Sequence, residues 1–216
     1  EDVHTQLVIV GGGPAGLGAA IAASDAGLTD IIVVEKLDIL GGNGKFDMNF
    51  FDLINSQAMI KAGNEMTKEE FIASKESSGE SPERIQDWAD GEWELDEWLR
   101  SYGVELNYNY GGTNHMAEAD AYAGEEILDG MEAKVKELGI DVRTGTKGYD
   151  LIIDDSGKVT GVKVQNKNNT YDINAKAVII ATGGFCYNKE LLAEYAPGYE
   201  VLNTSNQMGA TGDFVK

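Results

Sequence analysis

Residues 8–20 of this chain read VIVGGGPAGLGAA, an apolar run that enters a glycine cluster and leaves it through small residues. The residues from Leu7 to Val10 are apolar, mostly β-branched and bounded by glycine, which is typical of a short buried strand. Residues from Pro14 to Ala26 predict a helix, because a proline near the start of a helix lacks only an N–H group that the helix does not use. The stretch therefore predicts a strand, a tight glycine turn and a helix in direct succession.

The glycines of this turn have the spacing of the dinucleotide-binding fingerprint, G-x-G-x-x-G. Gly11 allows the tight turn, Gly13 lets a pyrophosphate approach the backbone, and Gly16 lets the helix and the strand pack closely. The first turn of the helix offers free N–H groups and a partial positive charge to the phosphates. The fingerprint by itself does not distinguish NAD from FAD.

An acidic residue follows the next apolar strand. Ile31–Val34 predicts that strand, and directly after it Glu35 offers a carboxylate that can accept hydrogen bonds from the two hydroxyls of a ribose. The alternative is a surface glutamate beside a turn that only packs. The order of strand, turn, helix, strand and acid favours the dinucleotide site.

Residues 46–122 show little strand signal, so we expect a mainly helical excursion there. The expected helices are Ser56–Gly63, Thr67–Ser77 and Pro82–Tyr102. We expect the tryptophans of the last helix to belong to the core, since an aromatic stripe at helical spacing needs no ligand; they are Trp88, Trp93 and Trp98. The acidic runs at residues 87–98 and 117–126 are expected to be solvated faces, and residues 111–123 a polar loop.

The last third of the chain alternates short apolar runs with turn residues. After a helix over Glu125–Leu138, the expected strands are Ile140–Arg143, Tyr149–Ile153, Val159–Val164, Thr170–Ile173 and Ala177–Ile180. The middle three form an expected antiparallel meander, and the last reads as a buried strand. The pattern as a whole predicts an α/β fold, a Rossmann-like domain whose parallel central sheet carries an antiparallel β-meander.

The composition excludes several classes of function. The 216 residues are enough for one core, or one domain with an excursion. The net charge of −20 argues against binding nucleic acid or an anionic membrane surface through a basic patch. No apolar run is long enough to cross a membrane, so no membrane insertion is expected. The chain begins with Glu1, so the lack of a visible signal peptide does not decide the compartment.

Metal and thiol chemistry are not expected. His4 and His115 are the only histidines, and neither has a nearby cysteine or a spaced acidic cluster to complete a metal site. The single cysteine, Cys186, excludes an internal disulfide. We expect it to be packed and not reactive, because no positive neighbour is evident that would lower its pKa.

Spaced motifs along nearly the whole chain resemble one family. They are EKLDILGGNGK at residues 35–45, GIDVRTGTKGYDLII at 139–153, AVIIATGGF at 177–185 and NQMGATGDF at 206–214. With the opening turn, they resemble the flavoprotein subunits of fumarate reductases and succinate dehydrogenases. The resemblance is closer to the soluble relatives, such as fumarate and urocanate reductases, that reduce acrylate-type double bonds.

The resemblance implies that the chain is the first flavin-binding segment of such a protein and that its cofactor is FAD. In the family the glycine turn binds the ADP half of FAD, the backbone near Gly148 contacts the adenine end, and the aspartate of the TGD segment meets the cofactor. The implied cofactor-binding residues are Gly11, Gly13, Ala15, Gly16, Glu35, Lys36, Gly42, Asn43, Gly44, Gly148, Ala181, Thr182, Gly183 and Asp213.

Departures from the family pattern shape the remaining expectations. Members with covalent FAD carry a histidine shortly after the second glycine pair, where this chain has Asn43-Gly44-Lys45, so non-covalent FAD is implied. Phe46, Phe50 and Phe51 stand where members have small residues and glycines. His115 follows a glycine loop, and it is expected to be either a solvated loop residue or a residue that faces the flavin.

The resemblance also implies a reaction. In the complete protein, hydride would pass from flavin N5 to the activated double bond of a small unsaturated acid, with electrons from a donor protein or domain. The family's catalytic residues lie in a capping domain and a returning flavin segment, so none is assigned here and residues 1–216 alone are expected to be inactive. The alternatives are a non-catalytic FAD-binding, electron-carrying domain and an NAD-binding domain. Cytoplasmic and exported locations both remain open, with export slightly favoured.

Overall fold

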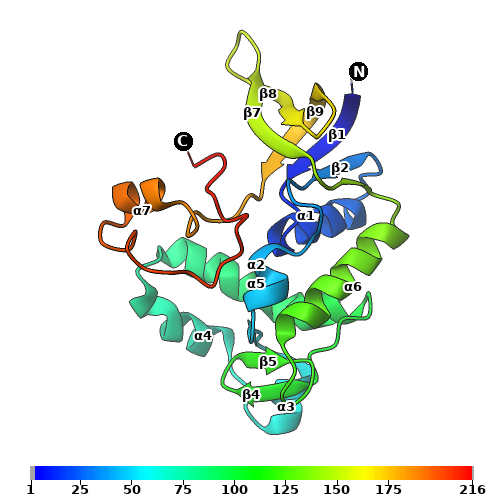
Figure 1. Cartoon of the computed structure of the whole chain (residues 1–216). Helices are drawn as coiled ribbons and strands as arrows, with labels where there is room; N and C mark the ends of the chain where they lie inside the picture. Colours follow the sequence, from blue (N-terminus) through cyan, green and yellow to red (C-terminus); the bar gives the residue numbers. More distant parts are fainter. Residues whose placement is uncertain (1–2, 216) are drawn as a thin grey trace. The chain divides into compact units, whose positions relative to one another are not determined.

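The described chain divides into two compact units. The computed structural model describes residues 3–215, apart from the side chain of Asp47. Unit 1 joins residues 1–47 to residues 131–216, and unit 2 is Met48–Gly130 (Figure 1). Unit 1 is therefore assembled from two segments that are far apart in the sequence.

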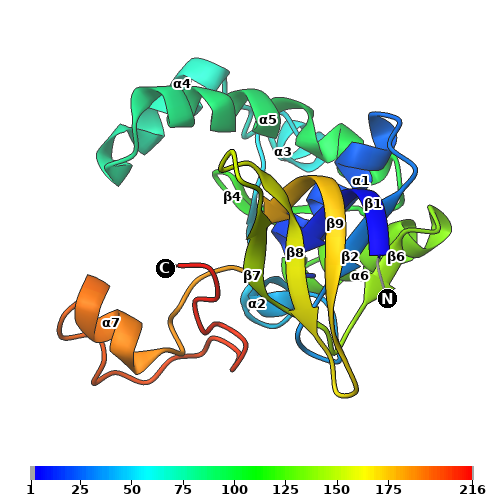
Figure 2. The same ribbon diagram turned by 90° about the horizontal axis from the view of Figure 1, so that it is seen from above.

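A six-stranded sheet forms the centre of unit 1, in the order β6-β2-β1-β9-β8-β7. Its strands are β1 (Val3–Val10), β2 (Ile31–Val34), β6 (Asp141–Arg143), β7 (Lys147–Ile153), β8 (Val159–Gln165) and β9 (Thr170–Ile180). The pairs β6–β2, β2–β1 and β1–β9 are parallel, whereas β9–β8 and β8–β7 are antiparallel (Figure 2). This arrangement confirms the expected α/β fold with a parallel sheet and an antiparallel meander.

Helix α1 (Pro14–Asp25) follows β1 as expected and lies against β1 and β2. It begins with Pro14 in its first turn and buries Leu17, Ala20 and Ile21. These apolar side chains are removed from water, which contributes roughly 1.5–3 kcal/mol for each fully buried leucine or isoleucine. The remaining helices of this unit are α2 (Gly42–Asp47), the end of α6 (Ala123–Glu137) and α7 (Lys189–Tyr195).

The strand at the centre of the sheet corrects one expectation. Thr170–Ile173 and Ala177–Ile180 were expected as two strands, but they are the two ends of the single strand β9. Its first half pairs with β8, while it pairs with β1 along nearly its whole length. The second half is not buried as expected, since Ile179 is 37% and Ile180 42% exposed. The short apolar run predicts a strand correctly but cannot say whether both of its faces are covered.

Unit 2 is mainly helical, with one small antiparallel sheet. Its elements are β3 (Phe51–Asp52), α3 (Gln57–Ala62), α4 (Lys68–Lys75), a 3-10 turn (Glu76–Ser78), α5 (Pro82–Arg100), β4 (Tyr108–Gly111), β5 (Asn114–Met116) and the start of α6. The hydroxyls of Ser56, Thr67 and Ser81 cap the N-termini of α3, α4 and α5. A hydroxyl at this position accepts a hydrogen bond from an N–H group that the helix leaves unpaired. The three short strands carried no recognisable sequence pattern.

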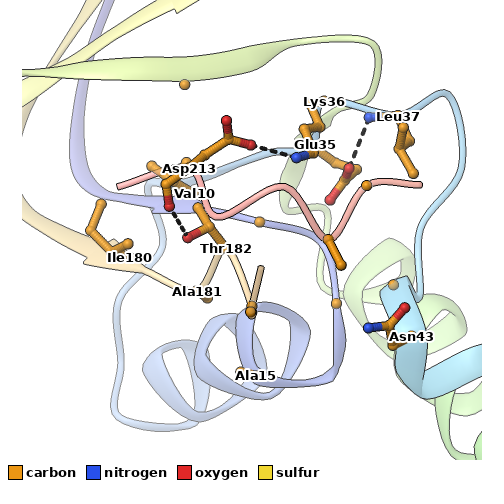
Figure 3. Close-up of a pocket in the computed structure, with 18 of the residues that line it drawn as sticks. Val10, Ala15, Glu35, Lys36, Leu37, Asn43, Ile180, Ala181, Thr182 and Asp213 are labelled. Atoms are coloured by element: carbon orange, nitrogen blue, oxygen red, sulfur yellow. Dashed lines mark hydrogen bonds and ion pairs between the residues drawn. The ribbon is translucent and has the colours of Figure 1, made fainter. Parts of the chain in front are cut away.

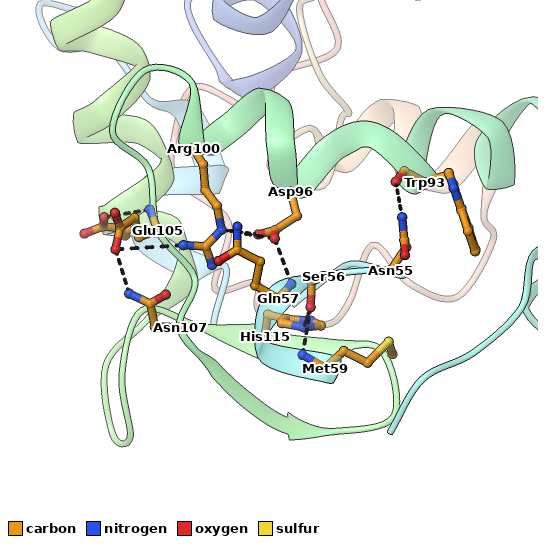
Figure 4. Close-up of polar contacts among 11 residues, drawn as sticks. Asn55, Ser56, Gln57, Met59, Trp93, Asp96, Arg100, Glu105, Asn107 and His115 are labelled. Atoms are coloured by element: carbon orange, nitrogen blue, oxygen red, sulfur yellow. Dashed lines mark hydrogen bonds and ion pairs between the residues drawn. The ribbon is translucent and has the colours of Figure 1, made fainter. Parts of the chain in front are cut away.

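Helix α5 differs from its expected solvated acidic face. Glu92 is 6% and Asp96 4% exposed, so two acids of the run at residues 87–98 are buried. Asp96 accepts hydrogen bonds from the backbone N–H of Gln57 at 2.9 Å and from Nε of Arg100 at 3.0 Å (Figure 4). The indole of Trp88, expected in the core, is 37% exposed. Helical spacing alone cannot show that Glu92 and Asp96 are buried while Trp88 is partly exposed, because an acid with a hydrogen-bond partner can occupy the buried face in place of an apolar residue.

His115 lies in strand β5 and is not a solvated loop residue, and both of its ring nitrogens have partners within the protein. The residue is fully buried, and its Nε2 lies 2.6 Å from Oγ of Ser56 (Figure 4). Its Nδ1 lies 2.8 Å from the carbonyl oxygen of Thr113. Burial lowers the pKa of His115 below its ordinary value, so the ring is neutral at neutral pH. Its contacts tie the β4–β5 hairpin to the N-cap of α3, which is a structural role.

Candidate cofactor-binding site

A cavity of about 570 Å³ opens in unit 1 at the carboxyl ends of the parallel strands, beside Val10, Val34 and Ile180 (Figure 3). This size suits a bound cofactor, since ligand pockets are typically about 300–1,000 Å³. In open α/β sheets, ligands bind in the crevice outside the carboxyl ends of the strands. Of the cofactor-binding residues expected from the sequence, all except Gly16 line it: Gly11, Gly13, Ala15, Glu35, Lys36, Gly42, Asn43, Gly44, Gly148, Ala181, Thr182, Gly183 and Asp213.

The turn between β1 and α1 has backbone geometry that only glycines permit. Gly11 has φ +115°, and a Cβ there would lie 2.2 Å from the carbonyl oxygen of Ala181. Gly16 does not line the cavity. It packs against the end of β1 instead, where a Cβ would lie 1.8 Å from the carbonyl oxygen of Gly11. These two glycines therefore let strand β1, strand β9 and helix α1 come together.

Gly13 has a different place in the same turn. It is the N-cap of α1, and it provides no side-chain acceptor for the N–H groups of the first turn. A Cβ on Gly13 would meet only the Cα of Gly42, at 3.9 Å. The backbone is thus bare on the cavity side, and the partial positive charge of the helix end faces it. This arrangement fits a pyrophosphate.

Glu35 follows the end of β2 and is 9% exposed. Its Oε2 accepts a hydrogen bond from the N–H of Gly12 at 2.8 Å, and its Oε1 accepts one from the N–H of Leu37 at 2.8 Å (Figure 3). The carboxylate is therefore held rigidly between the glycine turn and the chain beyond β2. An ionised carboxylate has about four acceptor positions, so two stay available for ribose hydroxyls.

The second glycine pair begins helix α2 beside the first turn. The N–H of Gly41 donates to the carbonyl oxygen of Gly12 at 2.9 Å, which fixes the two turns to each other. The side chain of Asn43 donates to Asn206 and accepts from the N–H of Gln207 at 2.9 Å. Asn43 therefore connects α2 to the segment that precedes the TGD residues.

Two lysines converge on Asp213. Nζ of Lys36 pairs with Oδ2 of Asp213 (Figure 3). Nζ of Lys147 lies 2.9 Å from Oδ1 of the same carboxylate. Burial opposes ionisation of Asp213, but the hydrogen bonds from the two lysines outweigh it and hold its pKa below the ordinary value. Thr211 also contacts this carboxylate, at 3.1 Å. Sequence reasoning missed Lys147, which adjoins Gly148, and Thr211, which lies two residues before Asp213.

The ATGG turn at the end of β9 completes the wall of the cavity. Oγ1 of Thr182 donates to the backbone carbonyl oxygen of Asp213 at 2.7 Å. Gly183 has φ +70°, and nothing lies within 4 Å of the place where its Cβ would be. The cavity is also lined by residues that the sequence did not assign, among them Leu37, Gln207, Gly209, Ala210, Phe214 and Val215.

The residues around the cavity fit a flavin dinucleotide. The bare turn at Gly13 would receive the pyrophosphate, and Glu35 the ribose. Lys36 and Lys147, which both pair with Asp213, would add positive charge near the adenosine half of the cofactor. Within residues 3–215, no group of three or more His, Cys, Asp or Glu side chains is arranged to hold a metal ion.

Cys186 lies just beyond the ATGG turn and is exposed, so the expectation that it is packed was wrong. Strand β9 ends at Ile180, so the chain has left the sheet before it reaches Cys186. None of the helices described between residues 3 and 215 is both long and apolar enough to span a membrane.

Comparisons with known proteins agree with this geometry. A family described as "FAD binding domain" matches residues 6–216. A probable fumarate reductase of Shewanella frigidimarina is 33% identical over 98% of this chain and 37% of its own length. A urocanate reductase of Eggerthella lenta is 30% identical over 96% of this chain and 36% of its own length. The chain thus spans little more than a third of these relatives.

A solved structure shows the same fold. The open conformation of a flavocytochrome c3 fumarate reductase has a TM-score of 0.92 and 31% identity, and the match covers 98% of this chain and 39% of that chain. The family match extends over almost the whole sequence and includes every residue that lines the cavity. The chain therefore belongs to the FAD-binding domain family and forms the FAD-binding part of a fumarate- or urocanate-reductase-like flavoprotein.

Proposed function

We propose that this chain is the part of a flavoenzyme that holds FAD for the reduction of the activated C=C bond of a small unsaturated acid. The observation that carries the proposal is the cavity built from Gly13, Glu35 and Asp213, in a chain similar along its whole length to two reductases of unsaturated acids. When bound, FAD would supply hydride from its N5 position.

The chain's own residues have the task of binding and orientation. The N-terminus of α1 stabilises the negative charge of the phosphates, and Glu35 fixes the ribose through its two hydroxyls. The pairing of Asp213 with Lys36 and Lys147 holds the TGD segment beside the chain that follows β2 and the start of β7. A flavin held in this way is oriented in advance, which lowers the entropic cost of placing it against an acceptor.

Recognition and protonation of the acid are proposed to come from elsewhere in a longer protein. Carboxylates are commonly held by arginine in a bidentate pair. Of the arginines that the structure describes, none lines the cavity. Arg143 instead pairs with Asp141 at 2.7 Å and contacts Tyr171.

The test compares the 216-residue chain with a chimera that adds the remainder of the Shewanella relative. Both are loaded with FAD, and oxidation of a reduced viologen dye is followed with fumarate, urocanate or a cinnamate as acceptor. Turnover is expressed per bound flavin. We expect both proteins to contain flavin and only the chimera to reduce an acceptor.

Two results would contradict the proposal. Acceptor-dependent turnover by the 216-residue chain alone would place the proton donor inside it. A chimera whose bound flavin is reduced by the dye, but which reduces none of these acids, would favour an electron-carrying domain instead. The matched control is the Gly13→Ala chimera, in which loss of flavin should abolish turnover.

A further inference from the structure

The side chain of Phe214 lies in the wall of the cofactor cavity and has no function assigned so far. It lines the cavity together with Val10 and Gly148. The ring is half-buried and packs against the core cluster that includes Val10 and Val34, the last residues of two parallel strands. One part of the ring thus rests on the sheet while another borders the cavity.

The backbone holds Phe214 in an unusual conformation. Its φ is +65°, which lies in the left-handed region that residues other than glycine and asparagine seldom adopt. Such a conformation persists only where the surrounding structure imposes it, and it occurs most often at functional sites. It is therefore not a relaxed loop position.

The residue before Phe214 provides that constraint. The carboxylate of Asp213 is held by Lys36 and Lys147, and its carbonyl oxygen accepts the hydrogen bond of Thr182. Asp213 is thus fixed at both its side chain and its backbone. These contacts fix the peptide that leads into Phe214.

The ring lies at the adenosine end of the cavity. The pyrophosphate belongs at the N-terminus of α1, and the ribose belongs at Glu35. Asp213 bridges Lys36, the residue after Glu35, and Lys147, the residue before Gly148. Phe214, which follows Asp213, is therefore placed beside the ribose subsite, on the side of β7.

We propose that Phe214 is a binding residue for the adenine ring of FAD and supplies the apolar surface on which that base rests. Beside the ring the cavity is lined by Val10, Gly148, Lys147 and Asp213, so Phe214 is the aromatic surface next to small or charged residues and one valine. Two flat aromatic rings attract each other in offset-stacked or edge-to-face arrangements by about 0.5–1.5 kcal/mol beyond the area they bury. The inference rests on the cofactor and not on the reaction proposed above.

The test measures binding of FAD, ADP and inorganic pyrophosphate to the 216-residue chain by calorimetry. Phe214→Ala should weaken binding of FAD and ADP about three- to tenfold, which corresponds to the loss of one stacking contact. Binding of pyrophosphate should be unchanged, because it has no base. A collapsed cavity would weaken the binding of all three ligands. Equal weakening of FAD, ADP and pyrophosphate binding would therefore overturn the proposal.

A second variant guards against misfolding. Phe214→Gly also lacks the ring, and glycine adopts φ +65° without strain, so this variant folds even if the alanine variant does not. It should show the same selective loss of FAD and ADP. Unchanged or tighter ADP binding in the folded variant would overturn the proposal, the latter by showing that the ring obstructs the cavity.

The matched control is Tyr171→Ala. Tyr171 packs on the same core cluster as Phe214 but does not line the cavity. Its removal should leave the ratio of the ADP and pyrophosphate dissociation constants at the wild-type value. If Tyr171→Ala changed that ratio as much as Phe214→Ala does, the weaker ADP binding would come from lost packing and not from a lost contact with the base.

Discussion

Gly13 is the N-cap of α1 and Gly16 lies in its first turn, and a methyl group would meet different surroundings at the two positions. At Gly13, which lines the cavity, it would have only the Cα of Gly42 within 4 Å. At Gly16 it would lie 1.8 Å from the carbonyl oxygen of Gly11. The fingerprint therefore combines one position that lines the cavity and has room for a methyl group with another where only glycine fits the fold.

Alanine at these two positions should separate ligand binding from stability. Gly13→Ala should keep the wild-type free energy of unfolding, since φ −84° suits alanine, but it should weaken FAD binding at least tenfold by obstructing the pyrophosphate. Gly16→Ala should lower the free energy of unfolding by about 1–3 kcal/mol through overpacking. Denaturation without ligand and FAD titration measure the two effects. Equal loss of stability in both variants would contradict this division.

Glu35 is predicted to hold the ribose while it also caps two backbone groups. Glu35→Ala should weaken FAD binding by about 1–3 kcal/mol, the range for loss of a charged hydrogen-bond partner. Because Glu35 also accepts from Gly12 and Leu37, the alanine variant should lose stability as well. Glu35→Gln keeps an acceptor and serves as the control, with a smaller loss of both. Calorimetry that finds unchanged FAD affinity in Glu35→Ala would exclude the ribose role.

At the scale of secondary-structure elements, helix α5 shows how packing changes the chemistry of an acid. Glu92 accepts a hydrogen bond from Nε1 of Trp88 at 2.9 Å, and its Oε2 has no hydrogen-bond partner among the described residues. Burial raises the pKa of Glu92 from 4.5 to about 7, and the nearby Asp52 adds to this effect while Lys75 opposes it. The folded protein thus binds a proton at Glu92 that the unfolded chain releases.

The raised pKa has a definite consequence for stability. Between pH 4.5 and pH 7, Glu92 binds more protons in the folded state than in the unfolded state, so its contribution to the free energy of unfolding falls as pH rises. Glu92→Gln cannot ionise, and relative to wild type it should gain up to about 3 kcal/mol across this range. Urea denaturation at pH 4.5, 6 and 8 measures the difference. Glu94→Gln, an exposed position on the same helix, is the control; a Glu92→Gln curve parallel to wild type would show that Glu92 is not protonated.

At the scale of the whole molecule, one unit gathers the entire cavity from two distant segments. Lys36 and Asp213 are 177 positions apart and form an ion pair at the cavity wall. The unit would therefore lose its cofactor site if either segment were removed. The chain as a whole has a net charge of −20, yet two lysines, Lys36 and Lys147, line the cavity.

Non-covalent attachment is a prediction for the whole protein. Asn43, Gly44 and Lys45 follow Gly42 where a histidine would be needed, and His115 is buried in unit 2 with both ring nitrogens in hydrogen bonds. Acid precipitation of the FAD-loaded chain should therefore release all flavin to the supernatant, because denaturation removes the contacts that hold it. Absorbance of supernatant and pellet measures the distribution. Flavin that remains with the washed, denatured polypeptide would show a covalent bond.

The sequence by itself determined the elements whose cause is local. The strand, glycine turn, helix, strand and acid from Leu7 to Glu35 were predicted because steric freedom at glycine and β-branched runs act over a few residues. The same local patterns predicted most helices and the meander, and the spaced motifs led to the family and to FAD. Only the tertiary structure decided which side chains meet.

Burial and pairing between distant segments explain the differences. Glu92 looked solvated because its helix is acidic, but packing removed it from water. His115 looked like a loop residue until its partner Ser56, 59 positions away, was placed beside it. Asp213 and Lys36 were predicted at the site, but Lys147 and the pairing of both lysines with Asp213 were not, since an ion pair depends on three-dimensional distance and leaves no periodic pattern in the sequence.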